Sequence, residues 1–265
     1  MMMMNSTAHD PTIAPPMISV IGLHKSFGDK KVLRGIEIDV LRGESFVIVG
    51  GSGAGKSVFI KHLIGLLQPD DGHVVVDGVD LTLAPAEAVL VLRKQFGMSF
   101  QEGALFDSMT VFDNIAFPLR RHTDKNPEEV AARVDECLKL VRLPGIEDKM
   151  PSELSGGMRR RVGFARAIAL QPKILLFDEP TTGLDPINTA AIGRVINQLR
   201  AELDVTVVTI THDMSLAYRI ADRIAIMRRG QILQVDVPET FAKSRNRFVR
   251  GFLEGEMPEE LEDES

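Results

Sequence analysis

A glycine-rich segment that ends in lysine and serine carries the clearest chemical signal in this sequence. Residues 50–57 fit the pattern G-x-x-x-x-G-K-[ST], a loop whose backbone N–H groups surround the phosphates of a nucleotide. Lys56 is expected to bridge the β- and γ-phosphates and to take part in catalysis, and the Ser57 hydroxyl is expected to bind Mg²⁺. The nucleotide-binding set predicted from this loop is Gly50, Gly51, Ser52, Gly53, Ala54, Gly55, Lys56, Ser57 and Val58.

Two neighbouring acids could supply the rest of the chemistry. Asp178 and Glu179 follow the apolar run Ile174–Phe177, which is typical of a buried strand. Asp178 stands where a carboxylate would hold Mg²⁺ through water, and Glu179 where an acid would polarise the water that attacks the γ-phosphate. On their own, two adjacent acids would indicate only a solvated strand end, whereas the glycine segment, after a strand and before a helix, indicates a nucleotide site over a structural turn. The two motifs together favour a site for ATP and Mg²⁺.

Strands and helices must hold these groups in place. Apolar runs at 45–49, 173–177, 205–210 and 223–227 predict strands, while 56–67, 128–141 and 188–203 have helical spacing. This alternation predicts an α/β fold, a P-loop core with a mostly parallel sheet. Runs at 17–23, 32–41 and 74–79, with turns at 28–29 and 77–78, predict an antiparallel β subdomain. The stretch from Phe96 to Arg166 reads as mostly helical, which predicts a helical subdomain inserted at about 97–166.

Composition limits the remaining possibilities. Residues 17–253 are expected to fold, between a disordered extension at 1–16 and an acidic tail at 254–265. The net charge of −6 argues against a broad basic surface, so no nucleic-acid partner is expected. No apolar run reaches the roughly 18 residues of a membrane span, and residues 1–16 lack the features of a signal peptide. The single cysteine, Cys137, is expected to be an inert buried thiol, and no His/Cys cluster has metal-ligand spacing.

A short segment between the two motifs narrows the class of protein. Leu154-Ser155-Gly156-Gly157-Met158 begins 20 residues before Ile174, and with it the sequence resembles the ABC ATPases over about residues 17–253. Ser155, Gly156 and Gly157 open a predicted helix, so unpaired N–H groups are expected at its start. In that family this signature contacts the γ-phosphate of an ATP held by a second subunit. The resemblance therefore implies a head-to-tail dimer with two-fold symmetry that encloses two ATP molecules.

The same resemblance assigns roles to further residues. His212 comes two residues after the strand-like run 205–210. It matches the family's histidine that contacts the γ-phosphate as a switch. Asp185 matches the D-loop that signals across the dimer, and Gln101 the Q-loop glutamine that senses Mg²⁺ and leads to the transmembrane subunit. Phe27 is in the place of the aromatic ring that stacks on adenine. The arginines at 159–161 are expected on the exposed side of the signature helix, or paired with acids at the dimer interface.

A finer resemblance points to one transport system. The stretch Gln101–Arg120, and Glu153–Arg161 with Met158 where other importers have Gln, look like the Mla/Mce-type phospholipid transport ATPases. This implies a multi-pass permease, an Mce-domain lipid-binding subunit and a STAS-domain protein as partners, at the cytoplasmic face of the inner membrane. Three alternatives stay open. Ala104–Leu119 could be subdomain core only, the chain could serve an importer of amino acids or metal complexes, or it could be a non-transport ABC switch.

Overall fold

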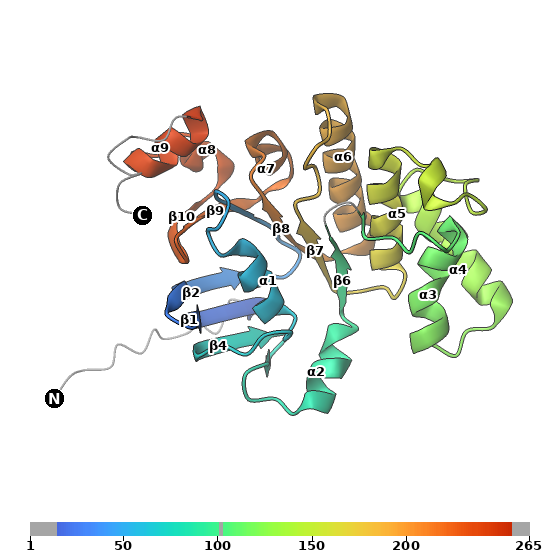
Figure 1. The fold of residues 1–265 in the computed structure, drawn as a ribbon, viewed down its shortest axis with the longest axis horizontal. Coiled ribbons are helices and arrows are strands. Elements are labelled where there is room, and N and C mark those ends of the chain that lie inside the picture. The colour runs from blue at the N-terminus through green and yellow to red at the C-terminus, as the bar shows by residue number, and fades with distance from the viewer. Residues whose placement is uncertain (1–14, 101–102, 256–265) are drawn as a thin grey trace.

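Two β-sheets form the framework of the molecule (Figure 1), and the computed structural model describes residues 15–100 and 103–255. The smaller sheet is antiparallel, with strand order β2-β1-β4-β5, and the larger has the order β10-β9-β3-β8-β7-β6. In the larger sheet β9, β3, β8, β7 and β6 are parallel, and β10 is antiparallel to β9. The strands are β1 Ile18–Phe27, β2 Lys30–Val40, β3 Ser45–Val49, β4 Asp71–Val76, β5 Val79–Asp80, β6 Phe96–Ser99, β7 Ile174–Asp178, β8 Thr206–Thr211, β9 Arg223–Arg228 and β10 Gln231–Asp236.

Helices cover both faces of the larger sheet. Helix α1 lies between the two sheets, whereas α5, α6 and α7 pack on the opposite face of the larger one (Figure 1). Helices α3 and α4 pack against α5 and complete a helical subdomain. The helices are α1 Lys56–Leu63, α2 Ala86–Arg93, α3 Val111–His122, α4 Pro127–Leu140, α5 Gly156–Ile168, α6 Pro186–Leu203, α7 Met214–Ile220, α8 Pro238–Phe241 and α9 Arg247–Glu254.

The strands of the larger sheet are buried on both sides. In β3, Phe46 and Ile48 belong to the core around α1, while Val47 and Val49 belong to the core under the other helices. Successive side chains of a strand point to opposite faces, so a strand between two cores must be apolar throughout. This is why the run at 45–49 is continuously apolar and shows no alternation.

The predicted α/β fold is confirmed, and two strands were missed. The turns at 28–29 and 77–78 are in place, since they join β1 to β2 and β4 to β5. The expectation that the chain turns helical at Phe96 was wrong, because Phe96–Ser99 is strand β6, paired with β7. A Cβ atom on Gly97 would lie 2.3 Å from the carbonyl oxygen of Ala167 in α5. Strand β6 is therefore fixed by a close tertiary contact that no local pattern reveals, and β10 was missed as well.

The predicted domain limits stay predictions. Residues 1–14 and 256–265, which include most of the expected extension and of the acidic tail, lie outside the described residues. Within residues 15–100 and 103–255, no helix combines the length and the apolar character that crossing a bilayer requires.

A buried arginine joins two helices of the subdomain. Arg133 of α4 donates from Nε to the Ala169 carbonyl at 3.1 Å and from Nη2 to the Ile168 carbonyl at 2.6 Å. These carbonyls end α5, where the last turn of a helix leaves acceptors unpaired. The guanidinium therefore caps α5 from a neighbouring helix, and its charge is balanced by Glu136 at 2.7 Å.

Cys137 lies one helical turn from this cap and is fully buried, as expected. Burial raises the pKa of the thiol to about 12, so the folded protein holds it neutral, and the thiolate is the reactive form. We expect no alkylation of native protein by iodoacetamide at pH 8 and rapid alkylation in urea, measured by intact mass. Alkylation of the native protein at the rate of a free thiol would contradict this burial.

A buried asparagine organises the segment before α3. The Asn114 side chain accepts from Phe106 N at 2.8 Å and donates to the carbonyls of Phe106, Met109 and Thr110. Replacement by alanine would remove all four bonds, so the Phe106 N–H and the Met109 carbonyl would lose this partner. The carbonyls of Phe106 and Thr110 would keep their bonds from Met109 N and from the backbone N–H of residue 114. We expect Asn114→Ala to lower the free energy of unfolding by about 3 kcal/mol, measured by urea denaturation. Asn197→Ala, at an exposed bond to the Arg219 carbonyl, is the control and should cost less than about 1 kcal/mol.

Candidate nucleotide site

The glycine loop connects the end of β3 to the start of α1, as the sequence predicts. A Cβ atom on Gly50 would lie 2.4 Å from the carbonyl oxygen of Met227, so only glycine fits there. Gly55, at the N-terminus of α1, has φ +109°, a conformation that other residues rarely adopt. The loop is thus shaped by its glycines and ends on a helix N-terminus, where backbone N–H groups and the helix dipole favour phosphate.

Lys56 points back into this loop. Its Nζ donates to the carbonyls of Gly50 at 2.6 Å and Gly51 at 3.0 Å, and lies 3.7 Å from Glu179 Oε1. Burial lowers the pKa of the Lys56 ammonium, although Glu179 and Asp178 act in the opposite direction. A partly buried ammonium with only carbonyls and carboxylates around it is suited to a phosphate.

The two acids stand at the end of β7, beside β8. Burial, and then the like charge of Glu179, raise the pKa of Asp178, which a bound cation would reverse. Glu179 has φ +49°, and its N–H donates to the Ile210 carbonyl at 2.8 Å. This left-handed conformation is rare for residues other than glycine and is held by the adjoining strand.

His212 contacts Glu179 directly. His212 Nδ1 lies 2.8 Å from Glu179 Oε2, and the His212 N–H donates to the same oxygen at 3.3 Å. The Thr182 hydroxyl donates to this oxygen too, at 3.3 Å. The carboxylate is therefore fixed in one orientation by three donors from two loops.

One cavity of about 850 Å³ collects most of the predicted residues. Its lining comes from the β1–β2 turn, the glycine loop and the ends of β7 and β8: Phe27, Lys30, Val32, Gly51, Ser52, Gly53, Ala54, Gly55, Lys56, Ser57, Val58, Asp178, Glu179, Thr182 and His212. Phe27 is half exposed and lies 5.7 Å from the Lys25 ammonium. The cavity is large enough for a nucleoside triphosphate, and both an aromatic ring and Lys56 line it.

The donor set of this cavity fits Mg²⁺. The Ser57 hydroxyl and the Asp178 carboxylate both line it, and both are hard oxygen ligands of the kind that Mg²⁺ takes together with water and phosphate. In the described part of the chain no three His, Cys, Asp or Glu side chains come close enough to hold a metal by themselves. The remaining ligands would therefore come from the nucleotide, from water and from the predicted Gln101, which lies outside the described residues.

The signature segment, residues 154–158, lies outside the lining of this cavity. Ser155 precedes α5, and its hydroxyl accepts from Met158 N at 3.3 Å. Gly156 and Gly157 form the first turn of that helix, and no residue of this segment is among those lining the cavity. The sequence prediction of a helix N-terminus at this position is confirmed. What it contacts in a partner remains a prediction.

Asp185 is the N-cap residue of α6, as Ser155 is of α5. Its side chain accepts from the N–H groups of Ile187 and Asn188, each at 2.9 Å, and bonds to Asn188 hold the pKa of the carboxyl below its ordinary value. Gln101 lies outside the described residues, so its predicted contact with Mg²⁺ stays untested.

The three consecutive arginines of α5 do not all lie on the exposed side of the helix. Arg159 is exposed, but Arg161 is only half exposed and Arg160 is 6% exposed, donating to the Thr182 carbonyl. Residues 160 and 164 lie one helical turn apart, so Arg160 shares the buried face with Phe164. Lys30, Val32 and Thr182 line the cavity but were not predicted as site residues. The position of Thr182, one turn after Glu179, was the only available signal for it.

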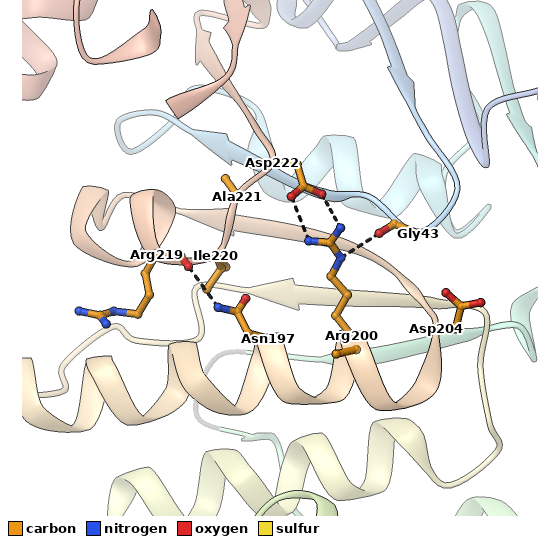
Figure 2. A pocket seen from close by; sticks show the side chains of 9 residues that line it. Gly43, Asn197, Arg200, Asp204, Arg219, Ile220, Ala221 and Asp222 are labelled. Atoms are coloured by element: carbon orange, nitrogen blue, oxygen red, sulfur yellow. Dashed lines mark hydrogen bonds and ion pairs between the residues drawn. The ribbon is translucent and has the colours of Figure 1, made fainter. Parts of the chain in front are cut away.

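A second cavity, of about 460 Å³, lies at the amino ends of the parallel strands, beside the residues that precede β3, β8 and β9 (Figure 2). Arg200 forms two bonds to Asp222, at 3.0 and 2.6 Å, and donates from Nε to the Gly43 carbonyl at 2.8 Å. Asp222 also accepts from Ser45 N at 3.0 Å. These groups satisfy one another, so this network braces strand ends and does not form a ligand site.

The fold and the first cavity define a P-loop NTPase of the ABC type. Residues 33–182, more than half of the chain, match the family described as ABC transporter, and the chain belongs to that family as its ATP-hydrolysing component. It is 44% identical over 238 residues to a probable ribonucleotide transport ATP-binding protein of Mycobacterium leprae, covering 90% of this chain and 69% of the relative.

Two further relatives bear on function. A methionine import ATP-binding protein of Carboxydothermus hydrogenoformans is 40% identical over 253 residues, covering 92% of this chain and 75% of the relative. Among solved structures, the ATP-binding cassette MJ0796, a dimer in a post-hydrolysis state bound to ADP and Pi, superposes with a TM-score of 0.76 at 29% identity. That superposition covers 84% of this chain and 99% of the cassette.

Proposed function

We propose that the cavity above α1 binds ATP with Mg²⁺ and that Glu179 positions the attacking water. Lys56 holds the β- and γ-phosphates, Phe27 stacks on the base, and Ser57, Asp178 and Gln101 serve the metal. His212 orients Glu179 and contacts the γ-phosphate. The supporting observation is that Lys56, Asp178, Glu179 and His212 meet in one cavity. Bound Mg²⁺ would neutralise charge on the β- and γ-phosphate oxygens.

The complete site requires a second copy of the chain. Ser155–Gly157 present a helix N-terminus that no phosphate in the same copy reaches, because these residues do not line the cavity of the described chain. In a head-to-tail dimer each signature faces the P-loop of the other copy, and Asp185 reaches across the same interface. The dimer of the related cassette bound to ADP and Pi supports this arrangement.

An apolar groove beside β6 is the proposed contact for a membrane permease. It has a volume of about 380 Å³, and Phe100, Phe106 and Phe117 on its walls are 46%, 42% and 40% exposed. The rings of Phe106 and Phe117 lie 5.0 Å apart, and the Arg166 guanidinium lies 5.6 Å from the Phe106 ring. Exposed aromatic side chains beside an arginine are typical of the centre of a protein interface.

The segment that forms this groove is also the one that resembles the phospholipid transport ATPases. Val111, Ile115, Ala116 and Leu119 are buried, so the core interpretation holds for these positions. The core interpretation does not explain Phe106 and Phe117, because the side chains of both are exposed. We therefore favour a lipid transporter whose permease docks at this groove on the cytoplasmic face of the inner membrane, with an Mce-domain subunit and a STAS-domain protein as further partners.

A small-molecule importer is the second candidate. It is favoured by the names of two relatives, which concern ribonucleotide transport and methionine import. The ABC transporter family makes a non-transport switch the weaker reading.

Purification of the tagged full-length chain from detergent-solubilised membranes of its own organism separates these candidates. We expect co-purification of a multi-pass protein, an Mce-domain protein and phospholipid, identified by mass spectrometry. Recovery of a permease with a small-molecule binding protein and no lipid would overturn the lipid assignment. Phe106→Ala with Phe117→Ala should reduce permease recovery at least about tenfold. Leu233→Ala, which removes a side chain of similar exposure on β10 at the other edge of the sheet, should not.

A further inference from the structure

The signature helix is tied to the loop that follows Glu179 within one copy of the chain. Arg160 lies one turn into α5 and is almost fully buried. Its Nη2 donates to the carbonyl of Thr182, which is separated from it by β7 in the sequence. A buried guanidinium is costly unless its hydrogen bonds hold it in place, so this contact fixes the two segments relative to each other.

The first turn of α5 packs against the same loop. A Cβ atom on Gly157 would lie 3.2 Å from Asn188 Oδ1, and one on Gly156 would lie 3.8 Å from Leu184 Cδ2. Asn188 in turn donates to the Asp185 carboxylate. The start of α5 and the start of α6 therefore form one packed unit (Figure 1), and Arg160 joins that unit to Thr182.

Thr182 leads to the proposed catalytic acid. Its hydroxyl donates to Glu179 Oε2 at 3.3 Å, and its N–H donates to the Glu179 carbonyl at 3.4 Å. A continuous path thus runs from the first turn of α5 through Arg160 and Thr182 to the Glu179 carboxylate. The links from Arg160 to Thr182 and from Thr182 to Glu179 are hydrogen bonds.

We propose that Arg160 is a positioning residue that couples the signature of one subunit to Glu179 of the same subunit. This inference rests on the proposed head-to-tail dimer. There, the start of α5 contacts the ATP held by the partner's P-loop, whereas Glu179 acts on the ATP held by its own. Arg160 thereby makes the orientation of Glu179 in one site depend on ATP in the other, so the two sites are linked through side chains within each subunit.

Steady-state kinetics give the first test. Arg160→Met, which keeps the length and removes the donor, should lower kcat at least tenfold, change the KM for ATP less than threefold, and lower the Hill coefficient toward 1. Arg160→Lys can still donate to the Thr182 carbonyl and should recover most of the rate. Arg159→Met, at the exposed neighbour, is the matched control and should behave as the parent. Thermal unfolding confirms that each variant is folded.

Heterodimers with two affinity tags separate coupling from a local defect in the signature. With Arg160→Met in one subunit and Glu179→Gln in the other, the only intact Glu179 sits beside the altered residue 160, and hydrolysis should be at least tenfold slower than in a parent/Glu179→Gln heterodimer. With both substitutions in one subunit, the intact Glu179 keeps its own Arg160, and the rate should match that reference.

The opposite pattern would show that Arg160 serves only the signature presented to the partner, and equal loss in both arrangements would show a general effect on the dimer. Either result overturns the proposal, as does an Arg160→Met protein with the parental rate. Failure of Glu179→Gln to form ATP-dependent dimers in size-exclusion chromatography would instead contradict the proposed dimer itself. The two failures are therefore distinguishable.

Discussion

Replacement of Glu179 by glutamine is expected to lower kcat for ATP hydrolysis by at least about a hundredfold while ATP still binds. Glutamine has nearly the same shape, and its amide oxygen can keep the hydrogen bonds from His212 and Thr182. It lacks the negative charge that polarises the attacking water. The loss should therefore fall on the chemical step, and the affinity for nucleotide should stay within about threefold, because Lys56 and the glycine loop are unchanged.

Two measurements check this result. Phosphate release gives kcat, and size-exclusion chromatography with ATP and Mg²⁺ should show dimers that persist, because hydrolysis no longer reopens them. Glu239→Gln, at an exposed position in α8, is the control and should hydrolyse ATP at the parental rate. If Glu179→Gln did the same, Glu179 would not be the catalytic acid, and the meeting of Glu179 and His212 would need another explanation.

Replacement of Lys56 by alanine is expected to weaken nucleotide binding about a hundredfold. A charge-assisted hydrogen bond contributes about 1.5–3 kcal/mol, and the Lys56 ammonium lies within the glycine loop, bonded to the carbonyls of Gly50 and Gly51. The substitution also removes the cation 3.7 Å from Glu179 Oε1, so two partly buried acids would remain near the incoming phosphates without it. Both effects act against ATP.

Isothermal titration with ATP and Mg²⁺ measures this loss. Lys61→Ala is a matched control, since it removes an exposed ammonium from the same helix, α1, outside the cavity lining. Its affinity should stay within about threefold of the parent. A Lys56→Ala protein with parental affinity for both ATP and ADP would show that the glycine loop alone holds the phosphates.

The residues that meet in the cavity were predictable because their motifs are local and the fold places the ends of parallel strands together. Lys56 follows β3, Glu179 follows β7 and His212 follows β8, so the order β3-β8-β7 brings them to one edge of the sheet. Strand β6 was not predictable in this way. Four residues with a glycine carry little pattern of their own, and this strand is fixed by α5 packed against Gly97.

The burial of Arg160 also could not be predicted from the sequence. Three consecutive arginines indicate an exposed surface, and for Arg159 that is correct. Arg160 is buried and donates to the Thr182 carbonyl, which comes from a turn that follows a different strand. The left-handed backbone of Glu179 is a similar case, because the acid occupies a conformation usual for glycine and no residue preference points to it.

The absence of the signature segment from the cavity lining has a consequence for kinetics: in the proposed dimer, ATP hydrolysis would be second order in the concentration of the chain. Ser155–Gly157 are absent from the lining formed by the described chain, so in the proposed dimer each productive site must be assembled from two molecules. For dilute, unassembled chain the rate should rise with the square of its concentration. A permease that holds two copies side by side replaces that concentration with an effective one in the millimolar range. In the proposed transporter, ATP would therefore be hydrolysed by copies already bound to the permease, without any separate inhibitor.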